Sequence, residues 1–112
     1  MNLAEVYRLR NDEAAAERVL REGVANDAGS AALRHALGLT LVRQHRVAEA
    51  LPELAKAAQL DRTSSRYVYV YAVALHDGGQ PGNAVKVLKD AQARGLGDRA
   101  IDEALRAYSA GQ

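Results

Sequence analysis

The chain has 112 residues, enough for one small domain, and its 15 lysines and arginines against 14 acidic residues leave a net charge of +1. This balance provides no broad positive field for nucleic acid or for an anionic membrane. The absence of cysteine excludes disulfides, thiol catalysis, zinc–thiolate sites and thioether-linked haem.

The sequence offers no segment for a membrane. No apolar run approaches the ~20 residues of a membrane span, and the start MNLAEVYRLR lacks a signal peptide's apolar stretch. We therefore expect a soluble protein without membrane insertion. Cytoplasm and periplasm both remain open, depending on the parent protein.

Apolar residues recur at intervals of three and four, which is the spacing of one helix face. This pattern predicts short antiparallel helices joined by tight turns. Ser30 and Ser64 stand where an N-cap hydroxyl accepts a free backbone N–H, and the glycine-rich segment 78–82 predicts a turn. In chain order, helices are predicted over residues 2–10, 13–25, 31–44, 47–60, 65–77, 82–94 and 98–109.

The strongest pattern is a repeat of 34 residues, which is typical of stacked helical arrays. Small residues meet small ones and large apolar residues meet large ones when the chain is shifted by that period. The middle copy holds Leu37, Gly38, Leu41, Ala50, Leu54 and Ala57. The next copy holds Tyr71, Ala72, Leu75, Ala84, Leu88 and Ala91, and the preceding one holds Leu3, Ala4, Tyr7, Ala16, Leu20 and Gly23.

Two local features oppose the helical prediction. The segment Tyr67–Leu75 is rich in aromatic and β-branched residues, which favour strands. We predict a helix there because propensity differences are tenths of a kcal/mol, whereas burying a large side chain contributes roughly 1.5–3 kcal/mol. Pro52 lies near the first turn of a predicted helix and is expected to bend that helix slightly without ending it.

On these six recurring positions, the periods 31–64 and 65–98 resemble the tetratricopeptide repeat (TPR). The resemblance implies an all-α solenoid, an α-α superhelix in which the first helix of each repeat lines a concave groove. It divides the single domain 1–112 into a truncated repeat 1 (1–30), repeat 2 (31–64), repeat 3 (65–98) and a capping helix (98–109). The stripe expected to face back onto repeat 3 is Ala100, Ile101, Ala104, Leu105 and Tyr108.

The resemblance also implies where a ligand binds. The groove positions in this register are Glu5, Arg8, His35, Leu39, Arg66, Tyr69, Val73 and His76. The lysine and asparagine with which chaperone-binding members hold a carboxylate are missing from these positions. An apolar and aromatic floor of Leu39, Tyr69 and Val73 remains, with His35, Arg66 and His76 as a polar rim, which suits a peptide or helix with apolar anchors.

No residue pattern indicates catalysis. The three histidines, His35, His45 and His76, share no metal-ligand spacing, and no nucleophile is placed beside His76 and Asp77. The glycine-rich segment 78–82 lacks the lysine and hydroxyl of a phosphate-binding loop. We expect no enzyme activity, no catalytic residue, no bound metal and no cofactor.

The leading functional hypothesis is a non-enzymatic scaffold for a protein or peptide partner, without nucleic-acid binding. It is expected to be part of a larger, bacterial-looking protein. The chain also resembles the TPR tails that accompany multihaem cytochromes. An alternative is a structural role, in which homo-oligomers stack through the open N-terminal repeat. An RNA-binding repeat array is less favoured because the charge is near neutral.

Overall fold

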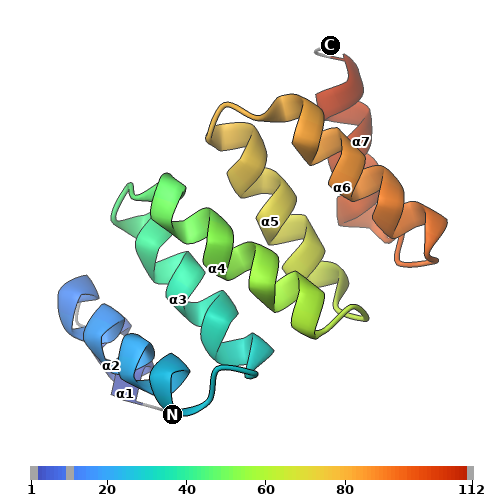
Figure 1. Cartoon of the computed structure of the whole chain (residues 1–112). Coiled ribbons are helices and arrows are strands. Elements are labelled where there is room, and N and C mark those ends of the chain that lie inside the picture. Colours follow the sequence, from blue (N-terminus) through green and yellow to red (C-terminus); the bar gives the residue numbers. More distant parts are fainter. Residues whose placement is uncertain (1–2, 10–11, 111–112) are drawn as a thin grey trace. The chain divides into compact units, whose positions relative to one another are not determined.

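The computed structural model describes residues 3–9 and 12–110, without the side chains of residues 8 and 9 (Figure 1). All regular elements in these ranges are α-helices, and their ends lie within two residues of the predicted ones. They are α1 (Leu3–Leu9), α2 (Glu13–Asn26), α3 (Ala31–Arg43), α4 (Val47–Leu60), α5 (Ser65–Asp77), α6 (Pro81–Ala93) and α7 (Arg99–Ala110).

The helices form two compact units, Met1–Leu60 with α1 to α4 and Asp61–Gln112 with α5 to α7. In the first unit, α1 packs on α2, α2 on α3, and α3 on α4. In the second unit, α5 packs on α6, and α7 packs on both. Within each unit, each helix thus contacts the next helix in the sequence, as expected of helical hairpins.

The core of the first unit lies mainly between α3 and α4. It is built by the residues that recur in the repeat, Leu37, Leu41, Ala50, Leu54 and Ala57, none of which is more than 1 % exposed. A Cβ atom placed on Gly38 would lie 2.5 Å from Cδ2 of Leu54. Glycine is therefore needed at this position because α3 and α4 approach each other closely.

The core of the second unit repeats this pattern with different side chains. Val68, Ala72 and Leu75 of α5 are buried, as are Ala84, Leu88 and Ala91 of α6. The segment Tyr67–Leu75 is helical throughout, which confirms the prediction made against its strand propensity. Packing overrides propensity here because α5 buries one continuous face.

Helix starts recur with the same period. Backbone N–H groups of Leu33 and Tyr67 donate to the hydroxyls of Ser30 and Ser64, at 3.2 and 3.1 Å. The N–H of Ile101 donates in the same way to the Asp98 carboxylate, at 2.9 Å. The two serine caps were predicted, and Asp98 adds a third cap that starts α7.

Turns within the helical hairpins are closed by one backbone hydrogen bond that also recurs. Arg46 N–H donates to the carbonyl of Leu41 at 2.9 Å, and Gln80 N–H donates to that of Leu75 at 2.8 Å. Asp12 N–H donates to the Tyr7 carbonyl at 2.8 Å, one period earlier. Bonds of this kind satisfy carbonyls that would otherwise be left without a partner at helix C-termini.

Pro52 and Ala100 are two positions at which the predicted helices are tested. Pro52 lies inside α4, which continues to Leu60, so the helix does not end there, as predicted. Ala100 is exposed, so its expected place in the buried stripe of α7 is wrong. The stripe begins at Ile101, which is completely buried, since successive residues of a helix point about 100° apart and residues 100 and 101 cannot both face the core centre.

Candidate functional site

The candidate residues of the second unit lie on one side of α5. We call Arg66, Tyr69, Val73 and His76 the α5 face, since their spacing of three and four places them along one stripe of the helix. Arg66 and His76 are exposed, and Tyr69 and Val73 are half-buried. The core uses the other side of α5, through Val68, Ala72 and Leu75. The α5 face is therefore accessible to a partner.

An aromatic contact joins this face to α7. The ring of His76 stacks on that of Tyr108, with centroids 4.0 Å apart and planes 10° apart. Burial raises the pKa of the Tyr108 phenol, and Asp77 and Tyr69 raise it further. From the sequence, Tyr108 was expected only to pack against repeat 3, as part of the stripe on the capping helix. Its contact with His76 places it beside the α5 face as well.

The candidate residues of the first unit differ more in their exposure to solvent. Glu5 on α1 is exposed and Leu39 on α3 is half-buried, whereas His35 on α3 is only 6 % exposed. A histidine this buried offers little surface to a peptide. The side chain of Arg8, another predicted groove residue, lies outside the described part of the chain.

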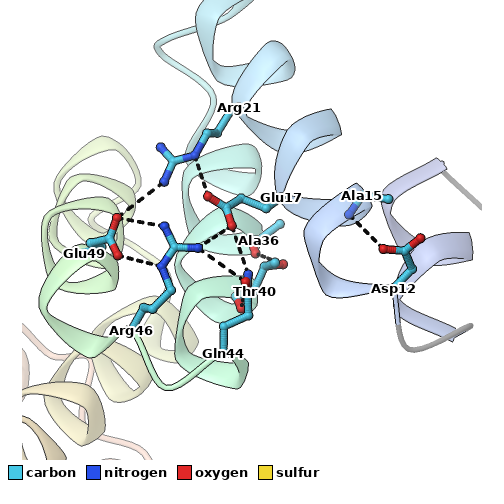
Figure 2. Close-up of polar contacts among 9 residues, drawn as sticks. All are labelled: Asp12, Ala15, Glu17, Arg21, Ala36, Thr40, Gln44, Arg46 and Glu49. Atoms are coloured by element: carbon cyan, nitrogen blue, oxygen red, sulfur yellow. Dashed lines mark hydrogen bonds and ion pairs between the residues drawn. The ribbon is translucent and has the colours of Figure 1, made fainter.

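A polar network in the first unit was not predicted (Figure 2). The Glu17 carboxylate of α2 accepts hydrogen bonds from Arg46, from Arg21 at 2.8 Å and from Gln44 at 3.1 Å. Arg46 also donates to both carboxylate oxygens of Glu49, at 2.6 and 2.8 Å. Two pairs are recognisable from local spacing, Glu17 with Arg21 and Arg46 with Glu49, but the links between helices are not.

The electrostatics of this network indicate a structural role. Mainly through the hydrogen bond from Arg46, with further bonds from Arg21 and Gln44, the pKa of Glu17 falls to about 2. The hydrogen bond from Arg46 likewise lowers the pKa of Glu49. Acids and arginines thus satisfy one another, which ties α2 to the turn between α3 and α4.

Metal-binding clusters and membrane-spanning helices are both absent from the described ranges. There, no group of three or more His, Cys, Asp or Glu side chains could hold a metal ion. No helix within residues 3–9 and 12–110 is both long and apolar enough to cross a bilayer.

No family model and no curated protein sequence matches the chain. Solved structures do match. The type III secretion chaperone SycD of Yersinia enterocolitica, bound to a peptide of the translocator YopD, superimposes with a TM-score of 0.84 at 17 % identity, covering 97 % of this chain and 88 % of that chain. The second TPR domain of human RPAP3, bound to an HSP70 peptide, gives 0.82 at 16 % identity, with 95 % and 88 % covered.

A third similar structure is the TPR2B domain of yeast Sti1 in complex with an Hsp70 peptide, with a TM-score of 0.81 and 21 % identity over 97 % of this chain and 92 % of that chain. The likeness extends over almost the whole length at low identity. It shows that the chain has the all-α repeat fold of TPR domains, as predicted from the 34-residue period.

Proposed function

We propose that this protein is a non-enzymatic interaction module that binds a polypeptide segment through the first helices of its repeats. The observation that carries the proposal is the α5 face, an accessible stripe of half-buried Tyr69 and Val73 between exposed Arg66 and His76. Tyrosine and arginine are favoured anchors in protein interfaces, and an apolar centre with a polar rim is the usual arrangement.

The structural neighbours support this proposal. SycD, RPAP3 and Sti1 share the fold, and each is described in complex with a peptide. In the first unit, the equivalent helix α3 carries half-buried Leu39 one period before Val73. We propose that Leu39 contributes an apolar anchor on that unit.

The test uses the full 112-residue chain in a selection from a phage-displayed library of random peptides, followed by affinity measurement with labelled synthetic peptides. Tyr69→Ala is expected to weaken binding by about 2 kcal/mol, roughly 30-fold, the magnitude of a buried aromatic anchor. The control is Lys56→Ala, at an exposed position of α4, the second helix of repeat 2. It should change affinity less than twofold.

A selection that enriches no peptide over background would refute the proposed function. So would equal losses for Tyr69→Ala and Lys56→Ala. Circular dichroism of each variant ensures that folded proteins are compared.

Self-association is a second candidate function, favoured by one observation. Leu3 on α1 is 53 % exposed, so a large apolar side chain is available there for contact with another copy. If copies stack through α1, light scattering should show a concentration-dependent rise in mass that Leu3→Asp abolishes. A constant monomer mass up to millimolar concentration would eliminate this candidate.

A further inference from the structure

The end of the α5 face carries the carboxylate of Asp77, whose one ion-pair partner among the described residues is the imidazole of His76. Asp77 is the last residue of α5, and its Oδ1 lies 3.7 Å from Nδ1 of His76, a pair that is ionic only when the imidazole is protonated. Two other acids in the second unit have arginine partners, whereas Asp61, Asp98 and Asp102 accept hydrogen bonds from uncharged groups. Asp90 pairs with Arg94 at 2.8 Å and Glu103 with Arg99 at 2.9 Å.

The helix itself adds to this negative potential. The last carbonyl groups of a helix carry a partial negative charge, which favours cations and disfavours a carboxylate at that end. Asp77 lies at this end with a side chain that is 64 % exposed. A cation arriving from a partner would thus neutralise a charge that the fold places unfavourably.

Aromatic rings lie beside the same carboxylate. His76 and Tyr108 form a parallel stack in which each ring keeps one face free of the other ring, and the His76 side chain is 41 % exposed. Tyr69 lies on the same side of α5 as His76. The pKa of the Tyr108 phenol is raised by burial and then by Asp77 and Tyr69, so the phenol stays neutral near pH 7, and a neutral tyrosine ring can bind a cation on its face.

We infer that Tyr69, His76, Tyr108 and Asp77 form a subsite for the lysine or arginine side chain of a bound peptide. Cations bind the faces of tyrosine rings, and a nearby carboxylate adds a direct charge interaction. This inference rests on the proposed function, because it specifies the peptide that the α5 face selects. The partner is then a segment that carries both an apolar anchor and a basic residue.

The test is a double-mutant cycle on the peptides selected by the full chain. In each selected peptide the basic residue is replaced by glutamine, and in the protein Asp77 is replaced by asparagine. Loss of the basic residue should weaken binding to the wild-type protein about tenfold but to Asp77→Asn less than threefold. Tyr108→Leu, which removes the ring but keeps an apolar side chain, should weaken the basic peptide about fivefold.

Asp90→Asn is the matched control. It removes the same charge from an aspartate of similar exposure, 62 % against 64 %, in the same unit. For this variant, the ratio of the affinities for the basic peptide and the glutamine peptide should equal the ratio for the wild-type protein.

The outcomes separate the two proposals. Selected peptides without enrichment of lysine or arginine, or a glutamine replacement that costs the same in wild type and Asp77→Asn, would overturn the subsite and leave peptide binding intact. Equal effects of Asp77→Asn and Asp90→Asn would also overturn it, because they would reflect net charge alone. Failure to select any peptide would overturn the proposed function and the subsite together.

Discussion

His45 adopts a backbone conformation that side chains rarely occupy. Its φ is 60°, in the left-handed region, at the turn between α3 and α4. One period later the same turn position holds Gly79, with φ of 85°. Glycine has no Cβ to clash there, whereas another residue loses roughly 1–2 kcal/mol in this conformation.

We therefore expect His45→Gly to stabilise the protein. The gain should be about 0.5–1 kcal/mol, because relief of the backbone strain exceeds the extra entropy of glycine in the unfolded chain. Urea unfolding measures it. Gly79→Ala is the converse, and should cost about 1 kcal/mol although a Cβ there would meet nothing within 4 Å. A destabilised His45→Gly would show that the imidazole makes a compensating contact.

Gly38 is the residue on which the α3–α4 packing depends most directly. A Cβ at this position would lie 2.5 and 2.6 Å from Cδ2 and Cγ of Leu54, a side chain that is fully buried. We expect Gly38→Leu to cost about 3 kcal/mol or to prevent folding, since a buried leucine cannot move aside without opening the core.

Thermal melting of the variant checks this prediction, and leucine substitutions at two other glycines serve as controls. Gly29 has open space around it, so Gly29→Leu should leave the melting temperature within a few degrees. Gly79→Leu should be intermediate, because it strains only the backbone. An unchanged melting temperature for Gly38→Leu would contradict the close approach of α3 and α4.

At the scale of the elements, the Glu17 network fixes α2 against the α3–α4 hairpin. Arg46 bridges Glu17 of α2 and Glu49 of α4 from the turn between α3 and α4. Arg43 of α3 adds a second link, at 2.8 Å from Glu13 of α2. The network is more than a set of exposed pairs, because the Glu17 side chain is only 15 % exposed. Its carboxylate accepts hydrogen bonds from Arg46, Arg21 and Gln44.

Glu17→Gln should lower the free energy of unfolding by about 1–2 kcal/mol near pH 7, since charge-assisted hydrogen bonds contribute more than neutral ones. The pKa of Glu17 lies at about 2 in the fold, below the usual value of 4.5. Its stabilisation is therefore complete above the usual value and disappears as the pH falls from about 4.5 to about 2.

Urea unfolding at several pH values provides the measurement. The difference between wild type and Glu17→Gln should be constant from about pH 5 to 7 and should approach zero near pH 2. A difference that does not change over the acidic range would mean that Glu17 contributes through packing and not through its charge.

On the scale of the whole molecule, burial is uneven along the chain. The helices α2 to α6 each contain at least three buried residues, whereas in α7 only Ile101 is buried and, among the described side chains of α1, only Ala4. In repeat proteins stability is close to a sum of local terms, so weakly buried helices open first.

Hydrogen exchange should reveal this order. Amides of α1 and α7 are expected to exchange well before those of α3 to α6, on the same sample and at one pH. Ile101→Ala should speed exchange in α7 and leave the protection of α3 and α4 unchanged. Uniform protection over all helices would instead indicate a single cooperative unit.

The sequence by itself determined the helices, the repeat register, the serine caps and the glycine at position 38. These features depend on spacing along one helix or on comparison between copies, and both are present in the order of residues. It also determined that Tyr67–Leu75 is a helix, because burial of one face outweighs local propensity.

Only the tertiary structure decided which side chains from different helices meet. The burial of His35, the stack of His76 on Tyr108 and the link from Arg46 to Glu17 each depend on how helices are rotated and packed. A hydrogen bond or ring contact forms or fails over about 1 Å, whereas a periodic pattern locates a side chain only to one face of a helix.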